Sequence, residues 1–223
     1  HATVDAYRRA AERRGAVFRF GERVHAVETT AGAVTAVRAG DARIATAACV
    51  AAPGIQVNEL LAPLGHRLPL TVPMVTVVQT EPLPATLAPV LGVADADCAA
   101  RQQVDGRLRV TSGAQPWHER LVAEADGRPR VPVTTRSLAT TIETVSTILP
   151  VFADVPVAAV WAGLLDLTPD ALPVIDRVPD VEGLVVAAGL SGHGFGIGPV
   201  TGELVADLVT GAAPRLPLDA FRL

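Results

Sequence analysis

The chain has 223 residues with a formal net charge of −4, and 49% of its residues are hydrophobic. This is the composition of an ordinary globular protein of one or two domains, which argues against a disordered or low-complexity chain. The net negative charge provides no basic surface for nucleic acid, so we expect no nucleic-acid partner.

The amino-terminal part of the chain predicts one helix and then a series of strands. The helix is expected over residues 6–14, with Thr3 or Asp5 as its cap and Gly15 as its stop. The run 43–54 predicts a strand whose last half is uniformly apolar, which is typical of a strand buried on both faces. Runs bounded by glycines and rich in β-branched residues predict further strands over residues 16–20, 23–30 and 33–39.

The middle of the chain has the pattern of an antiparallel sheet. Residues 68–81 are β-branched and alternating, and predict one long strand. Residues 82–100 are rich in proline and alanine and predict a loop. A hairpin is expected over 101–113, because Asp105-Gly106 is a strong signal for a tight turn. A helix is expected over 133–148.

The most distinctive feature lies near the carboxyl end. An apolar strand over 183–188 is followed by GLSGHGFGIGP (189–199), with five glycines, and then by a predicted helix over 201–211. The loop is not a phosphate-binding fingerprint, because Ile197 or Pro199 stands where G-x-G-x-x-G requires its third glycine. The succession still places free backbone N–H groups and a positive helix end at one point. Without Cβ atoms, a flat ligand can approach that backbone closely.

Other chemistries find little support. His193 stands where the motif G-x-S-x-G of hydrolases needs a glycine after Ser191, so a serine hydrolase is the weakest hypothesis. The five histidines are isolated from one another, and we predict no metal site. The absence of lysine excludes a lysine base or Schiff base. We assign no catalytic residue.

The chain shows no apolar run near the roughly 20 residues that span a bilayer and no signal-peptide pattern. Cys49 and Cys98 lie far apart without a Cys-x-x-Cys spacing, so we expect reduced thiols, no membrane span and a cytoplasmic location. The sequence starts inside a helical pattern without an initiator methionine, as expected for a piece of a longer protein.

Two segments near the carboxyl end carry a resemblance. WAGLLDLTPDALPVID (161–176) and GLVVAAGLSGHGFGIGPVTGELVADLVTG (183–211) resemble the signature of the FAD-dependent amino-acid oxidase family, with its D-amino-acid, glycine and sarcosine oxidases. The chain is most similar to the beta-subunit type of opine and hydroxyproline dehydrogenases, whose loop also reads SGHGFGIGP. HATVDAYRRAAERRGAVFRFGERVHAVE, CVAAPGI and LDAFR are similar as well, so the resemblance covers nearly the whole chain. The family's opening strand, G-x-G-x-x-G turn and helix are missing from this sequence.

The resemblance implies an α+β or α/β fold. An antiparallel-sheet substrate domain would accompany the carboxyl-terminal portion of a FAD-binding domain, which is Rossmann-like with three layers. Residues 1–67 would be a partial FAD-binding domain and 68–160 the substrate-binding domain. Residues 161–223 would return to the FAD-binding domain with the glycine loop.

The resemblance also implies contacts with FAD. Val24 would lie at the adenine through its backbone, and Ala52 and Gly54 would line the ADP part. Gly163 falls where sarcosine oxidases carry a flavin-linking cysteine, so no covalent link is expected there. A helix beginning near Pro199 would direct its positive end at the flavin. The flavin side of the site would be formed by Ser191, Gly192, His193, Gly194, Phe195 and Gly196.

The usual anchors for a substrate carboxylate are absent, because Leu165 and Gly196 occupy positions where family members carry arginine or lysine. If the protein binds an amino acid, another arginine must supply the planar fork of donors. The candidates from the antiparallel sheet, each of which also reads as a solvated strand residue, are Arg101, Arg107 and Arg109.

The resemblance implies an FAD-dependent oxidase or dehydrogenase of an amine or amino acid. A hydride would pass from the C–H next to nitrogen to flavin N5 and leave an imine. We expect this chain alone to be colourless and inactive, because half of the FAD cradle is missing. Other subunits of a dehydrogenase complex are potential partners. The alternative is a non-catalytic module that binds a partner through an uncovered apolar face.

Overall fold

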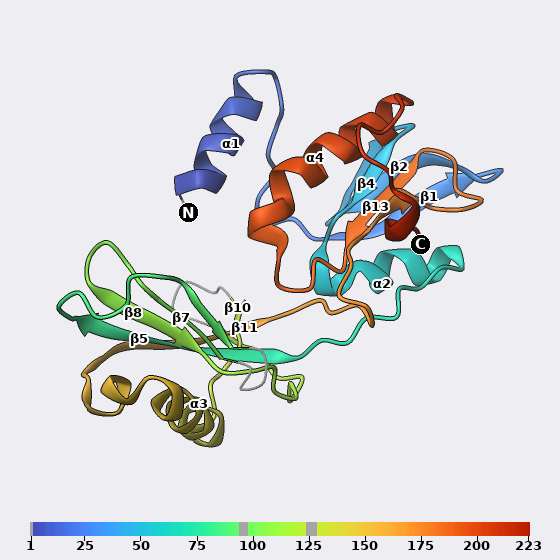
Figure 1. The fold of residues 1–223 in the computed structure, drawn as a ribbon. Helices are drawn as coiled ribbons and strands as arrows, with labels where there is room; N and C mark the ends of the chain where they lie inside the picture. The colour runs from blue at the N-terminus through green and yellow to red at the C-terminus, as the bar shows by residue number, and fades with distance from the viewer. Residues whose placement is uncertain (1, 94–97, 124–128) are drawn as a thin grey trace.

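Figure 1 shows the computed structural model of the chain, which describes residues 2–93, 98–123 and 129–223. The described residues form two lobes, and the chain passes from the first lobe to the second and back. The first lobe surrounds a small mixed sheet, and the second contains a five-stranded antiparallel sheet backed by one helix. This arrangement confirms the expected α+β fold class.

The first lobe has three layers. Its elements are α1 (Ala2–Glu12), β1 (Val24–Thr30), β2 (Ala33–Ala39), β3 (Ala42–Ala45), β4 (Cys49–Ala51), α2 (Val57–Leu61), β12 (Val174–Arg177), β13 (Leu184–Ala188) and α4 (Gly194–Thr210), with short 3₁₀ helices at Gly54–Gln56, Ala62–Leu64 and Asp219–Phe221. The central sheet has the order β12–β13–β4, in which β13 and β4 run parallel. The side chains of Leu204 and Leu208 on α4 pack against one face of this sheet. Leu61 on α2 and Val27 on β1 pack against the other face, so every residue of β13 is buried.

The second lobe has a covered face and an open face. Its elements are β5 (Met74–Pro82), β6 (Leu91–Val93), β7 (Cys98–Gln102), β8 (Arg107–Thr111), β9 (Val122–Ala123), β10 (Pro129–Arg130), α3 (Thr135–Ile148), a 3₁₀ helix (Pro150–Asp154) and β11 (Val157–Leu164). The sheet order is β11–β5–β8–β7–β6, with all pairs antiparallel. Strand residues alternate between faces, so Val78, Leu108 and Val110 pack with Val145 of α3. The opposite face is not covered by α3.

Several predicted elements are confirmed. The strand expected over 33–39 is β2, and the expected hairpin is formed by β7 and β8. Gly106 in its turn has φ of +85°, a conformation that favours glycine. The helix expected over 133–148 is α3, which begins two residues later because the Thr134 side chain caps it together with Ser137.

Two predicted strands are wrong. Residues 16–20 form no strand and are all exposed, so no neighbouring element provides the packing that β propensity reflects. The run 43–54 divides into β3, which pairs with β2, and β4, which pairs with β13. β4 is at the sheet edge and Val50 is 41% exposed, so burial on both faces is also wrong.

Two boundaries differ as well. The loop expected over 82–100 contains β6 and the start of β7, and its residues 94–97 lie outside the described part of the chain. The last helix begins at Gly194 and not near Pro199. Its first turn forms because the amides of Gly196 and Ile197 both donate to the carbonyl of His193, at 2.9 and 3.2 Å. The domain boundaries after residues 67 and 160 stay predictions, and the second falls inside β11.

The segment that follows α4 is held by an ion pair whose strength depends on pH. Arg215 contacts both carboxylate oxygens of Asp207, with Nε–Oδ2 2.9 Å and Nη2–Oδ1 3.0 Å. The Arg215 guanidinium lowers the pKa of Asp207. A lowered folded-state pKa contributes stability that is present above the ordinary carboxyl value of about 3.9 and is lost as the pH falls through the lowered pKa.

We therefore expect Asp207→Asn to lower the thermal unfolding midpoint at pH 7, and this difference from the original protein to shrink as the pH falls below roughly 4. Thermal unfolding followed by circular dichroism at several pH values measures the difference. Glu203→Gln is the control, because the Glu203 carboxylate contacts the same Arg215 on an exposed surface. A difference that stays constant with pH would contradict the assignment.

Candidate functional site

The candidate site forms where β13 meets α4. The chain leaves the buried end of β13 and turns through residues 189–193. Gly189, Ser191 and Gly192 have φ values of +68°, +49° and +82°. A left-handed backbone costs a residue other than glycine about 1–2 kcal/mol. The turn at Ser191 therefore needs support from other groups.

Asp166 provides much of this support. Its Oδ2 accepts hydrogen bonds from the amides of Gly189 and Leu190, at 2.9 and 3.2 Å. Its backbone carbonyl accepts another from the Ser191 amide at 3.2 Å. Hydrogen bonds to a charged group contribute about 1.5–3 kcal/mol each. Asp166 is thus a positioning residue for the glycine turn. Within WAGLLDLTPD no local pattern marks it for this role.

Ser191 is held a second time by Thr168. The Thr168 amide donates to Ser191 Oγ at 3.2 Å, and the two hydroxyl oxygens are 3.1 Å apart. Ser191 Oγ also donates to the carbonyl of Gly189 at 3.1 Å. Both side chains are buried. These contacts give the Ser191 hydroxyl a structural role. No pattern in the sequence around Thr168 predicts its contact with Ser191.

The glycines of the site serve two different purposes. A Cβ on Gly189, where φ is +68°, would lie 2.5 Å from Thr168 Cγ2, so packing and backbone both favour glycine there. A Cβ on Gly194 would lie 2.9 Å from Leu190 Cδ1 and would require the Leu190 side chain to shift. A Cβ on Gly163 or Gly196 would meet no heavy atom within 4 Å. These two glycines border open space, where a ligand could approach the backbone.

The parallel pairing of β4 and β13 brings two segments that were predicted to contact FAD to the same edge of the central sheet. Ala52 and Gly54 follow the carboxyl end of β4, and the glycine turn follows the carboxyl end of β13. Ligands of open α/β sheets bind outside the carboxyl ends of the strands. Val24 begins β1, and its neighbour Arg23 forms an ion pair with Glu59 of α2, the helix that follows Gly54.

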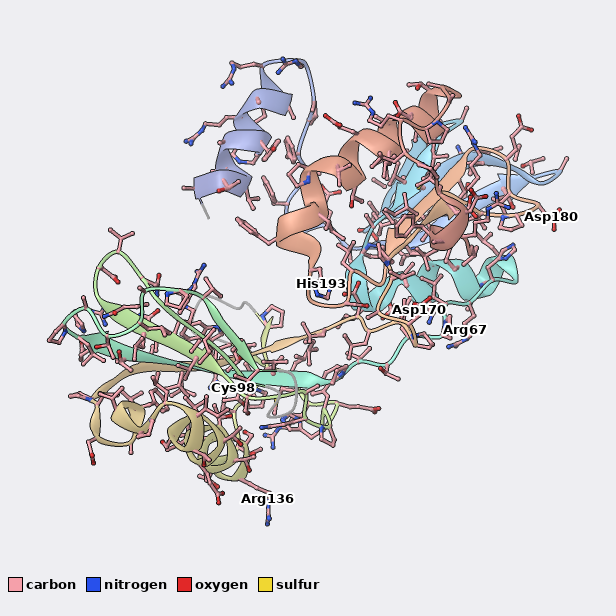
Figure 2. The ribbon with its side chains drawn as sticks, viewed as in Figure 1. Arg67, Cys98, Arg136, Asp170, Asp180 and His193 are labelled. Atoms are coloured by element: carbon pink, nitrogen blue, oxygen red, sulfur yellow. The ribbon has the colours of Figure 1, made fainter. Side chains whose placement is uncertain are left out.

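A cavity of about 830 Å³ lies between the glycine turn and the open face of the five-stranded sheet. Figure 2 shows His193 at the amino end of α4, on the side toward the sheet that carries Cys98. Among the residues lining this cavity are Val75, Val77, Thr111, Trp161, Gly163, Leu165, Ser191, Gly192 and His193. Most of these side chains are apolar or absent, which suits a flat and largely apolar ligand.

Only some of the residues predicted to contact FAD line this cavity. It includes Gly163, Ser191, Gly192 and His193. Gly194, Phe195 and Gly196 instead form the first turn of α4, where the Phe195 side chain is 76% exposed. The positive helix end is thus at residues 194–195, closer to the cavity than a helix starting near Pro199 would place it.

The three candidate arginines differ in their surroundings. Arg107 is already paired, with Nη1 3.1 Å from Glu81 Oε2 and Nε 3.6 Å from Asp105 Oδ2. Arg101 and Arg109 form no ion pair with another described residue. Leu165 presents an apolar side chain to the cavity, so it cannot bind a carboxylate there.

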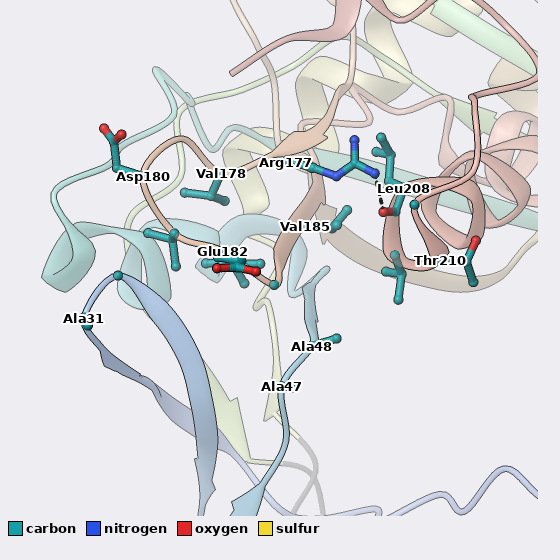
Figure 3. Close-up of a pocket in the computed structure, with 16 residues that line it drawn as sticks. Ala31, Ala47, Ala48, Arg177, Val178, Asp180, Glu182, Val185, Leu208 and Thr210 are labelled. Atoms are coloured by element: carbon teal, nitrogen blue, oxygen red, sulfur yellow. Dashed lines mark hydrogen bonds between the residues drawn. The ribbon is translucent and has the colours of Figure 1, made fainter.

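A second cavity, of about 700 Å³, lies at the opposite end of β13 (Figure 3). Arg177 closes one side of it by donating from Nη2 to the Leu208 carbonyl at 2.6 Å. A Cβ on Gly183 would lie 2.2 Å from the Ala47 carbonyl oxygen, so the backbones pack tightly here. Because this cavity is at the amino end of the strand, it is not our candidate site.

Four further properties concern the described part of the chain. It contains no group of three metal-ligating side chains, and no helix in it is long and apolar enough to cross a membrane. Cys49 and Cys98 lie in different sheets and form no disulfide with each other. Burial raises the pKa of the Cys49 thiol, which makes it a poor nucleophile at neutral pH.

The sequence has curated relatives. D-amino acid dehydrogenase from Xanthobacter autotrophicus is 32% identical over 213 residues, which are 92% of this chain and 46% of that protein. The enzyme of the same name from Methylobacterium nodulans is 33% identical over 208 residues, with the same two coverages. The chain therefore spans about half the length of these relatives.

The fold also has close counterparts. L-proline dehydrogenase from P. horikoshii has a TM-score of 0.84 at 23% identity, over 99% of this chain and 57% of that one. Glycine oxidase from Geobacillus kaustophilus has a TM-score of 0.83 at 24% identity, over 96% and 55%. The model of the family DAO, FAD dependent oxidoreductase, matches residues 1–208. The chain belongs to this family of FAD-dependent oxidoreductases.

Proposed function

We propose that this chain supplies the flavin side and the substrate sheet of an enzyme that oxidises an amine or amino acid with FAD. The observation that carries the proposal is the cavity between the glycine turn and the open sheet face. Bound flavin would accept a hydride from the C–H next to the substrate nitrogen. The residues of this chain would bind and orient the reactants and exclude water from them.

The cavity has features that fit a flavin ring. Gly163 and Gly192 both line it, and a Cβ on Gly163 would meet open space. The amides of Gly194 and Phe195 begin α4 and have no acceptor within the helix, so they can stabilise negative charge at the ring. We propose that the flavin lies along Gly163, the turn residues Ser191, Gly192 and His193, and the first residues of α4, which are Gly194, Phe195 and Gly196.

The ADP part of FAD is proposed to lie at the carboxyl edge of β4. Ala52 is exposed there, and Gly54 adopts φ of +60° with no heavy atom within 4 Å of a Cβ. Val24 would contribute its backbone near the adenine. These three assignments rest on position in the fold, and we assign no catalytic side chain.

A chimera tests the cofactor and the reaction separately. Residues 2–208 would replace the matching segment of the Xanthobacter autotrophicus D-amino acid dehydrogenase. We expect the purified chimera to carry FAD, with absorbance near roughly 450 nm, and to be bleached anaerobically by an amino acid or amine. The 223-residue chain alone, which contains no G-x-G-x-x-G, should be colourless.

Each outcome has a distinct meaning. A folded but colourless chimera would contradict the cofactor site, provided the unaltered relative binds FAD in parallel. A coloured chimera that no amine or amino acid bleaches would contradict the proposed reaction. Flavin bound to the chain alone would contradict the expectation that half of its cradle lies elsewhere.

A second candidate is a module that binds another protein. β4 has a neighbour on one side only, and α1 has no buried residue. Tyr7, Phe18 and Phe20 are 59%, 41% and 75% exposed. Open strand edges and exposed apolar groups mark interaction sites. Light scattering of the purified chain discriminates, because a stable monomer at high concentration argues against this candidate.

Three finer assignments are also proposals. The substrate class of small amines or amino acids is taken from the family, and the resemblance to the beta subunits of opine or hydroxyproline dehydrogenases suggests other subunits as partners. A cytoplasmic location is proposed from the cysteine usage of the sequence.

A further inference from the structure

The open face of the five-stranded sheet carries a pair of arginines one row beyond the strand residues that line the cavity. Trp161, Val77, Thr111 and Ala99 form one row across β11, β5, β8 and β7, and all four line the cavity. Two residues further along each strand, the next row on the same face is Ala159, Gln79, Arg109 and Arg101. The second row is displaced from the first by about 7 Å.

The side chain of Arg109 is held in place, but one of its hydrogen-bond donors has no acceptor. Its Nη2 donates to Gln79 Oε1 at 2.8 Å, and its guanidinium carbon lies 5.2 Å from the centre of the Trp161 ring. Its Nε is buried without a hydrogen-bond partner. Because Trp161 lines the cavity, these contacts place the planar guanidinium of Arg109 beside one residue of the cavity wall.

Arg101 adds a second positive charge to the same row. It lies directly opposite Arg109 in the antiparallel pair of β7 and β8. Like charges directly opposite one another are destabilising. Within residues 2–93, 98–123 and 129–223, no acidic side chain forms an ion pair with either arginine. An anion bound between the two guanidinium groups would relieve this repulsion and supply the missing acceptors.

We propose that Arg109 and Arg101 bind a carboxylate of the substrate. The row lies beyond Trp161 on the side away from the glycine turn, whereas Gly163 lies two residues from Trp161 toward it. The carboxylate would therefore be remote from the carbon that is oxidised, and the substrate class is an amine or amino acid with a distal acidic group. This assignment of substrate rests on the proposed function, whereas the anion site itself does not.

Binding of glutarate to the purified chain tests the site without flavin. Chemical shifts of the arginine Nε–H groups would be followed in ¹⁵N-labelled protein at fixed ionic strength. We expect the signals of Arg109 and Arg101 to shift saturably with glutarate but not with its neutral diamide. Because charge-assisted hydrogen bonds are lost, Arg109→Gln and Arg101→Gln should each weaken binding about tenfold or more.

Arg107→Gln is the matched control. Arg107 is on the same strand and face, two residues from Arg109, but is already paired with Glu81 and Asp105. We expect it to change glutarate affinity by less than about twofold. An equal loss in Arg107→Gln would indicate general charge attraction and overturn the site, as would full binding in Arg109→Gln.

Two further variants test the site even if Arg109→Gln fails to fold. Arg101 is exposed, so Arg101→Gln should fold even if Arg109→Gln does not. Arg109→Lys keeps the charge but loses the planar fork, and should bind glutarate with intermediate affinity. None of these experiments needs FAD. A colourless chimera would therefore contradict the proposed function, whereas the carboxylate site is tested only by the glutarate titrations.

Discussion

Replacing Gly189 with alanine is expected to destabilise the protein by about 2–4 kcal/mol. The residue has φ of +68°, which costs alanine about 1–2 kcal/mol. The new methyl group would also lie 2.5 Å from Thr168 Cγ2, and overpacking of this kind costs about 1–3 kcal/mol. Thr168 cannot turn away easily, because its hydroxyl donates to the Leu172 carbonyl at 2.8 Å. Thermal unfolding should show a midpoint lowered by roughly 5–15 °C.

A second substitution separates the strain of the left-handed backbone from the collision with Thr168. Thr168→Ser removes the colliding methyl group and keeps the hydroxyl, so it should recover part of the stability lost in Gly189→Ala, with a coupling of about 1 kcal/mol or more. Gly196→Ala is the control, because its Cβ meets no heavy atom within 4 Å inside α4. We expect this control to be neutral or slightly stabilising. Strictly additive effects at 189 and 168 would contradict the predicted collision.

Replacing Asp166 with alanine is expected to destabilise the protein by about 2–3 kcal/mol and to loosen the glycine turn. The amides of Gly189 and Leu190 would lose their charged acceptor. Since Ser191 is held in a left-handed conformation beside them, the turn should relax. In the chimera, FAD occupancy per chain should therefore fall more than the unfolding midpoint alone would account for. Absorbance per protein, measured below the unfolding transition, gives this occupancy.

Asp170→Ala provides the comparison for Asp166. The Asp170 carboxylate accepts one local hydrogen bond, from the Leu172 amide at 3.0 Å, on an exposed surface. Its loss should cost less than about 1 kcal/mol and leave the FAD occupancy unchanged. Asp166→Asn keeps an oxygen acceptor and should lie between the original protein and Asp166→Ala. Equal FAD occupancy in Asp166→Ala and the original protein would remove Asp166 from its positioning role.

The glycine turn illustrates what a local pattern can reveal. The succession of apolar strand, glycines and helix is readable because each element has its own short-range signal, and the fit to the family lies in the same residues. The hairpin at Asp105-Gly106 was predictable for the same reason, since two residues set the turn. By contrast, the start of α4 at Gly194 depends on amides that donate to the carbonyl of His193. That arrangement has no sequence motif.

Sheet membership could not be predicted, because strand pairing joins segments that are distant in the chain. The run 43–54 reads as one strand, but β3 pairs with β2 and β4 pairs with β13. Val50 is apolar and still exposed, because β4 has a neighbour on one side only. For the same reason the positioning role of Asp166 could not be predicted, because the two amides that donate to its carboxylate lie more than twenty residues further along the chain.

The sequence by itself determined the family, the α+β class and the identity of the residues around the glycine turn, because these depend on which residues are neighbours in the chain. Only the tertiary structure decided which residues share a surface. It placed the glycine turn opposite the open sheet face, separated the paired Arg107 from Arg101 and Arg109, and brought Asp166 beneath the turn. Such contacts depend on strand register and on packing between lobes, and neither is encoded in any short stretch of sequence.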